Sequence, residues 1–214
     1  VAHHAAALGG TGVGVVIGGG AWATLAQCSV VQNDHSGVWV GGAGARATLE
    51  DVTLRGTRAR GAGPEALGVG LRGVRGASVT GRRVRIEANA ATGILAQDAT
   101  VDLTTGVIAF NRDDGVICTS GWQLTLSRFL VEENSPVNMA FGRGVARLHG
   151  VHVRSVFEAP RHPHGVELTG GTLEGDHVVI SGASEAGLAA QDGARVALTD
   201  SLVRDTQFVL GTQG

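Results

Sequence analysis

The sequence repeats about every 22 residues, and this period constrains the fold more than any other feature of the chain. Each unit has an apolar anchor, two further apolar or small residues at fixed spacing, a corner residue and a Gly-apolar-x-apolar segment. The pattern is complete in Leu25-Cys28-Val30-Asn33-Gly37, Leu103-Gly106-Ile108-Asn111-Gly115 and Leu126-Phe129-Val131-Asn134-Asn138. The residues that open the last segment are Gly14, Gly37, Gly68, Gly93, Gly115, Asn138, Gly165 and Gly187. A fixed period with occasional insertions is typical of a stacked repeat fold.

Two copies of the unit depart from this spacing. Val79 and Leu173 are assigned as anchors, and each is followed by two extra residues before the next apolar position. The opening glycines are expected where the backbone needs a positive φ or a tight corner. Asn138 fits the same demand, because Asn tolerates that conformation better than most residues.

Composition narrows the class of protein. The 214 residues are enough for one elongated domain, residues 1–214, and the 43% hydrophobic content argues against a flexible glycine-rich linker despite 35 glycines. A formal charge of −2 argues against nucleic acid as an obligate partner, and no stretch is long and apolar enough to span a membrane. All 17 basic residues are Arg, a bias that indicates a GC-rich bacterial genome. Cys28 and Cys118 fall at inward positions and are expected to be small core residues.

Three short runs in each unit alternate between apolar and polar residues, as in 38–40, 47–49 and 52–54. Alternation with period two predicts strands, and units of this length leave no room for a crossover helix. Successive units can instead coil so that each turn pairs in parallel with the next at about 4.8 Å. We therefore expect Leu25, Leu49, Leu103, Leu126, Leu148 and Leu198 in one inward ladder. The corner residues expected to stack as an asparagine ladder are Asn33, Asn89, Asn111 and Asn134.

At this point the chain resembles the right-handed parallel β-helix proteins of the pectate-lyase-like superfamily. The resemblance rests on the segments 111–116 (NRDDGV) and 132–134 (EEN) and covers roughly residues 14–206. It implies an all-β, right-handed parallel β-helix, a three-strand solenoid of about eight coils. Members of that group include polysaccharide lyases, uronate epimerases, glycoside hydrolases and glycan-binding adhesins and tail proteins. Such motifs specify the fold strongly and the activity hardly at all. An extracellular or cell-surface location is expected, with the chain forming part of a larger or processed protein.

Two inserted loops are predicted to leave the coil at one corner. Thr57 and Gly68 are eleven residues apart and Val156 and Gly165 nine, where five other units have four. Loops 58–67 and 157–164 would then form the walls of a groove, and loops on a rigid scaffold often carry binding residues. The groove residues proposed for catalysis or binding are Arg58, Arg60, Asp113, Asp114, Glu158, Arg161, His162 and His164. Their carboxylates could act on a uronate or hold a calcium ion. The alternative is that Asp113 and Asp114 only form a turn. No other metal site or cofactor is predicted.

The floor of this groove is expected to be largely apolar. Its outward residues are predicted to be Val16, Trp39, Gly70, Leu95, Ile117, Ala140, Glu167 and Ala189, of which only Glu167 is ionisable. An apolar stripe of this length indicates that a loop, a second chain or a sugar ring on Trp39 covers it. A second outward stripe comprises Val107, Leu130, Val179 and Leu202. These features favour a non-catalytic scaffold that binds a glycan, a protein partner or further copies of itself. The alternative is a carbohydrate-active lyase, epimerase or hydrolase.

Overall fold

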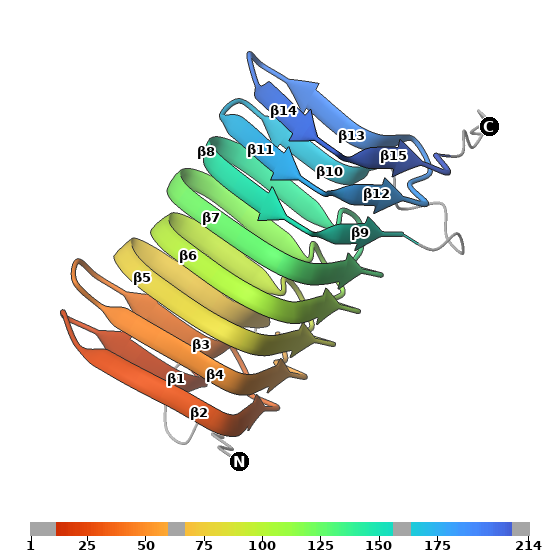
Figure 1. Cartoon of the computed structure of the whole chain (residues 1–214). Helices are drawn as coiled ribbons and strands as arrows, with labels where there is room; N and C mark the ends of the chain where they lie inside the picture. Colours follow the sequence, from red (N-terminus) through yellow and green to blue (C-terminus); the bar gives the residue numbers. More distant parts are fainter. Residues whose placement is uncertain (1–11, 60–66, 156–163, 207–214) are drawn as a thin grey trace, which may run out of the picture.

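The computed structural model describes residues 12–59, 67–155 and 164–206. These residues contain no helix, and their strands stack as the turns of a parallel β-solenoid (Figure 1). The strands are β1 Val13–Gly18, β2 Trp22–Val31, β3 Ser36–Gly41, β4 Arg46–Arg55, β5 Val69–Glu87, β6 Ile94–Ala109, β7 Val116–Glu132, β8 Met139–His149, β9 His152–Arg154, β10 His164–Thr169, β11 Thr172–Asp176, β12 Val179–Ser181, β13 Ala186–Gln191, β14 Arg195–Thr199 and β15 Leu202–Arg204. The predicted all-β parallel β-helix is confirmed.

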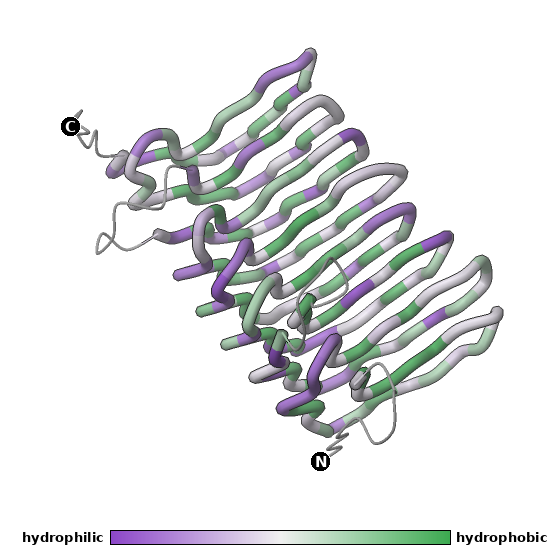
Figure 2. The backbone as a smooth tube through the Cα atoms, turned by 180° about the vertical axis from the view of Figure 1, so that it is seen from behind, coloured by the Kyte–Doolittle hydropathy of each residue, from purple (hydrophilic) through white to green (hydrophobic). Residues whose placement is uncertain are grey.

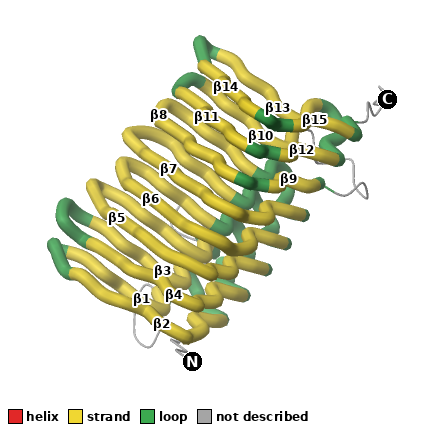
Figure 3. The backbone as a smooth tube through the Cα atoms, in the orientation of Figure 1, coloured by secondary structure: helices red, strands yellow, loops and turns green. Residues whose placement is uncertain are grey.

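The solenoid has three sheets, and every turn contributes one segment to each. The first sheet has the order β1-β3-β5-β6-β7-β8-β10-β13, which counts eight turns. The second sheet ends in β11 and β14, and the third ends in β9, β12 and β15. Strands such as β5 run through two corners and so belong to all three sheets, whereas the corners of other turns are drawn as loops (Figure 3). All pairings are parallel, as stacking of successive turns requires.

Hydrophobic and hydrophilic residues alternate along many of the strands (Figure 2). The buried apolar side chains form a core cluster that contains residues of most of the turns. The predicted leucine ladder is confirmed, because Leu25 pairs with Leu49, Leu103 with Leu126, and Leu126 with Leu148. The rungs between Leu49 and Leu103 and between Leu148 and Leu198 are Gly81 and Gly175. The ladder thus continues through all eight turns.

The assignment of Val79 and Leu173 as anchors was therefore wrong, and the two extra residues do not exist. Val79 and Leu173 belong to the neighbouring inward ladder, where they pair with Ala47 and Ala146. A Cβ added to Gly81 would lie 3.0 Å from Leu103 Cδ2, and one added to Gly175 would lie 2.5 Å from Leu198 Cδ2. Leucines of adjacent turns thus fill the space of the missing side chains. Both anchors were placed two residues too early. Because side chains alternate between the two faces of a strand, a shift of two residues leaves each side chain on its predicted face.

The same kind of error affects one opening glycine. Register places Gly70 beside Gly93, so Gly70 opens the strand and not Gly68. The opening glycines are not in the left-handed region, which corrects their predicted role. Glycine is required at these positions because a side chain would not fit. A Cβ on Gly115 would lie 2.6 Å from Asn134 Nδ2, and one on Gly93 would lie 2.8 Å from Asn111 Nδ2. The asparagine ladder packs against the bare backbone at these positions.

Three of the four predicted asparagines form a hydrogen-bonded ladder at the third corner, where the third sheet leads into the next turn, and Thr57 separates Asn33 from them. Asn89 Nδ2 donates to Asn111 Oδ1 at 2.9 Å, and Asn111 Nδ2 donates to Asn134 Oδ1 at 2.8 Å. The same oxygens accept the backbone N–H of the previous rung. Asn138 extends the ladder, since its Oδ1 accepts from Asn134 and its Nδ2 donates to Ser155 Oγ. Asn138 therefore occupies its glycine position to continue this hydrogen bonding, and its φ is not positive.

Left-handed backbone occurs at all three corners but not at the opening glycines: at the third corner it lies one residue before the rung, as at Gln32, Ala88 and Phe110, and it recurs in every turn at the second corner, between the second and third sheets. One residue per turn at this second corner has a φ between +48° and +62°, and seven of the eight are not glycine. They are Gln27, Asp51, Arg83, Thr105, Arg128, Gly150, His177 and Asp200. Successive side chains along this corner therefore line up from turn to turn.

Candidate functional site

The outward face of the first sheet carries the predicted stripe with one correction. In register, the row reads Val16, Trp39, Arg72, Leu95, Ile117, Ala140, Glu167 and Ala189. Arg72 takes the place assigned to Gly70, because the opening glycine of that turn was set two residues too early. The stripe thus has an ionisable group near each end, not Glu167 alone. Trp39, Leu95 and Ile117 point outward and are half-buried within the chain itself.

Trp39 lies flat along the sheet, and two glycines make this position available. A Cβ on Gly41 would lie 2.3 Å from Trp39 Cζ2, and one on Gly18 would lie 3.3 Å from Trp39 Cζ3. Gly41 is two residues after Trp39 and Gly18 pairs with Gly41, so both present bare backbone to the same face. The indole therefore rests on the backbone of two adjacent strands. A flat aromatic ring on a rigid strand can stack on the apolar face of a sugar.

A cavity of about 580 Å³ adjoins this ring. Its lining combines apolar, cationic and hydrogen-bonding groups: Val13, Val16, His35, Trp39, Arg72, Val74, Arg75, Gln97, Asp98 and Ser120. Arg72 is half-buried on the rung next to Trp39, whereas Arg75, Gln97 and Asp98 are exposed at the corner between the first and second sheets. Guanidinium groups bind carboxylates through two parallel hydrogen bonds, and Gln97, Asp98 and Ser120 can bond to hydroxyls.

Acidic groups and a histidine gather near the other end of the same sheet. His164 Nδ1 lies 3.5 Å from Glu167 Oε2, and His164 Nε2 lies 3.8 Å from Glu185 Oε2. Gln191 Nε2 donates to Glu167 Oε1 at 3.2 Å and so helps to hold the glutamate. A shallow depression beside Glu167 is lined by residues of β7, β8 and β10. His164 is thus the first residue of β10 and lies near two carboxylates, whereas the sequence placed it at the end of the loop 157–164 with Arg161 and His162.

Asp114 belongs to the same neighbourhood and has a perturbed acidity. Burial raises the pKa of Asp114 to about 6, the N–H of Val137 lowers it, and the charges of Asp113 and Glu167 raise it further. The Val137 N–H donates to Asp114 Oδ1 at 3.0 Å, which ties the carboxyl to the next turn. Asp113 is half-buried beside it. The predicted acid pair is therefore a partly buried group near neutrality with charged neighbours, an arrangement that proton transfer can use.

The structure does not join Arg58 to these carboxylates. Arg58 Nε lies 3.0 Å from the buried Asp34, and Arg58 Nη2 donates to the carbonyl of Gln32. Arg58 is two turns from the corner of Asp113, or about 10 Å at strand spacing. The remaining groove residues Arg60, Glu158, Arg161 and His162 lie outside the described residues, so the predicted groove walls stay a prediction.

The second outward stripe lies on the third sheet, with an unpredicted histidine within it. Val107 pairs with Leu130, Leu130 with His152, His152 with Val179, and Val179 with Leu202. Leu202 is exposed and Val107, Leu130 and Val179 are half-buried. Burial and the charges of Arg154 and Arg204 lower the pKa of His152, whose Nε2 lies 3.1 Å from Ser181 Oγ. A partner on this stripe stays a prediction.

Both cysteines are free and point inward, as expected. Burial raises the pKa of the Cys118 thiol, which keeps it in the unreactive protonated form. Sequence reasoning missed Arg72, Arg75 and Asp98 as lining residues. The 23-residue spacing from Gly70 to Gly93 was the signal that could have revealed Arg72, because it matches the period of the other turns.

The fold and this face define an eight-turn parallel β-solenoid with an aromatic and cationic cavity near one end of its first sheet. Comparisons with protein families, curated proteins and solved structures found no match for the chain. A helix that is long and apolar enough to cross a membrane does not occur among the described residues.

Proposed function

We propose that this protein is a non-catalytic scaffold that binds an acidic glycan on the outward face of its first sheet. The observation that carries the proposal is the cavity beside Trp39. A pyranose ring would stack on the indole, and a uronate carboxylate would bind Arg72 on the next rung. Gln97, Asp98 and Ser120 offer acceptors and donors to the hydroxyls.

The residues around the cavity beside Trp39 favour binding of a sugar over binding of an apolar ligand. A purely apolar ligand would leave the guanidinium and carboxylate groups at the cavity without new partners, whereas a glycan supplies both a ring face and polar groups. The rigid sheet fixes the indole before the ligand arrives, so little side-chain entropy is lost on binding. The expected location is extracellular or at the cell surface, where such glycans occur.

A panel of immobilised glycans that includes uronate polymers and neutral polysaccharides tests the proposal. The wild-type protein should retain uronate-containing members, and Trp39→Ala should lose most of this binding. Trp22→Ala is the matched control, because Trp22 is 79% exposed on β2 and does not line the cavity. Equal loss of binding in both variants, or binding that Trp39→Ala leaves intact, contradicts the proposal.

A second candidate function is carbohydrate lysis or epimerisation, and the acidity of Asp114 favours it. A carboxyl with a pKa near 6 is mostly ionised at neutral pH and is a stronger base than an ordinary aspartate, so it can accept the acidic proton beside a uronate carboxyl. A lyase assay on uronate polymers with and without added calcium distinguishes the two functions. Turnover that disappears in Asp114→Asn establishes the enzyme, and binding without turnover supports the scaffold.

A further inference from the structure

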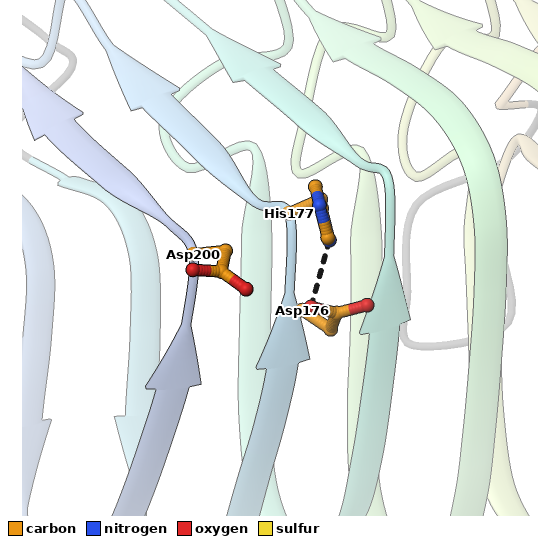
Figure 4. Close-up of side chains that lie close together, drawn as sticks. All are labelled: Asp176, His177 and Asp200. Carbon is orange, nitrogen blue, oxygen red and sulfur yellow. Dashed lines mark hydrogen bonds and ion pairs between the residues drawn. The ribbon is translucent and has the colours of Figure 1, made fainter.

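A second cluster of side chains lies far from this face, at the second corner of the last turns (Figure 4). Asp176 ends β11, His177 follows it, and Asp200 is the corner residue of the next turn. One ligand atom from each of the three lies within 4.8 Å of the others. His177 Nδ1 lies 2.7 Å from Asp176 Oδ1, so imidazole and carboxylate already converge.

A fourth residue supports the cluster from the preceding turn. His149 pairs with Asp176 in register, and His149 Nδ1 lies 2.7 Å from Asp176 Oδ2. The two oxygens of Asp176 are thus each held by a different imidazole, and the imidazole ring centres are 6.2 Å apart. A carboxylate whose second oxygen is held by a neighbouring histidine has the orientation that outer partners give to metal ligands.

The backbone fixes both corner residues. His177 and Asp200 have φ values of +52° and +48° on adjacent rungs, and the His177 N–H donates to the carbonyl of Thr199. Ser201 clamps the last corner, since its Oγ accepts from the Val178 N–H at 3.0 Å and donates to the Thr199 carbonyl at 2.7 Å. These contacts hold the positions from which the two side chains approach each other.

We propose that Asp176, His177 and Asp200 bind a divalent transition-metal ion such as Zn²⁺, with His149 positioning Asp176. One imidazole nitrogen and two carboxylate oxygens suit Zn²⁺ and its neighbours, whereas Ca²⁺ prefers oxygen ligands alone. The ion would join the last described turn to the turn before it. In this last described turn, Val196 and Val203 belong to inward rows but are 37% and 44% exposed, so a bond between the two turns would stabilise a poorly covered part of the stack.

The test is calorimetric titration of the chelator-treated, full-length protein with Zn²⁺, with thermal unfolding measured in parallel. One Zn²⁺ should bind with micromolar or tighter affinity and raise Tm, and His177→Asn with Asp200→Asn should weaken this binding at least tenfold. Asn is chosen because it tolerates the left-handed backbone at both positions. Asp192→Asn is the matched control, since Asp192 is exposed at another corner with a φ of +55°.

The control variant should bind Zn²⁺ as the wild type does. Hydrogen exchange should also slow in β14 and β15 when Zn²⁺ is added. Binding that survives the double substitution would place the metal on other histidines and overturn the proposal. Preference for Ca²⁺ over Zn²⁺, or the absence of Zn²⁺ binding, would do the same.

Discussion

At the scale of single residues, the third corner shows how one side chain can complete or interrupt a ladder. Thr57 occupies an asparagine rung, and among the described residues no hydrogen-bond partner reaches Thr57 Oγ1 or either amide atom of the buried Asn33. Buried polar atoms without partners cost stability. Gly37 lies next to Thr57 and leaves room for a larger side chain, as Gly70 and Gly93 do for the asparagines beside them.

We therefore expect Thr57→Asn to stabilise the protein by about 1–2 kcal/mol, because the new amide can bond to both Asn33 and Asn89. Urea unfolding measures the change. Thr53→Asn, on the outward face of the third sheet, should give no gain. A loss of stability in Thr57→Asn would show that the ladder does not tolerate a further amide at this rung.

Asp114 gives a pH-dependent prediction at the same scale. Its folded pKa of about 6 lies above the unfolded value of 3.8, so the folded protein holds this proton more tightly. The protonated Asp114 therefore contributes to the free energy of unfolding fully below about pH 4, and this contribution is lost as the pH rises through 6. Asp114→Asn keeps an acceptor for the Val137 N–H and should stabilise the protein by about 1 kcal/mol near pH 7.5. Thermal unfolding should show this gain disappearing near pH 4, and a gain that is the same at both pH values would contradict the assignment.

At the scale of elements, the second corner contains strain that can be relieved. Thr105 has a φ of +62°, which is costly for a β-branched residue. Thr105→Asn should raise stability by about 0.5–1 kcal/mol, and its side chain can still accept a hydrogen bond from Arg128, as Thr105 Oγ1 does. Thr104→Asn is the control on the same strand, outside the left-handed region. Urea denaturation of the two variants should give a free energy of unfolding that is higher for Thr105→Asn than for Thr104→Asn by about that amount. Equal free energies of unfolding would show that the backbone at Thr105 is not strained.

Much of the fold could be predicted from the sequence, because strand alternation and the corner asparagines repeat in every turn. The faces of Leu49, Trp39 and Ile117 follow directly from period-two alternation. The two errors in the anchor positions arose where leucines from neighbouring turns fill the space at a glycine, as at Gly81 and Gly175. A single-turn pattern cannot show that filling, so the nearest apolar residue was chosen instead. The site was less predictable, because the cavity at Trp39 depends on lateral pairing with Arg72 and on a corner from two further turns.

At the scale of the whole molecule, the first sheet presents different chemistry along its length. Trp39 and Arg72 lie toward one end, Leu95 and Ile117 follow, and Glu167 lies toward the other end. Their strands are β3, β5, β6, β7 and β10, which follow one another along the stack (Figure 1). A long polymer lying along the stack would therefore meet an aromatic and cationic segment before an acidic one. This change from cationic to acidic side chains along the sheet predicts that an acidic glycan binds near Trp39 and not near the carboxylates around Glu167.

In the proposed function, Arg72 binds the carboxylate of a glycan that stacks on Trp39. Titration calorimetry should compare a bound oligouronate with its carboxyl-reduced, neutral form, using the wild type and Arg72→Gln. Reduction of the carboxyls should weaken binding to the wild type about tenfold or more, because a charge-assisted pair is lost. The same reduction should have little effect on Arg72→Gln. If Arg72→Gln discriminates between the two sugars as strongly as the wild type does, the claim is wrong.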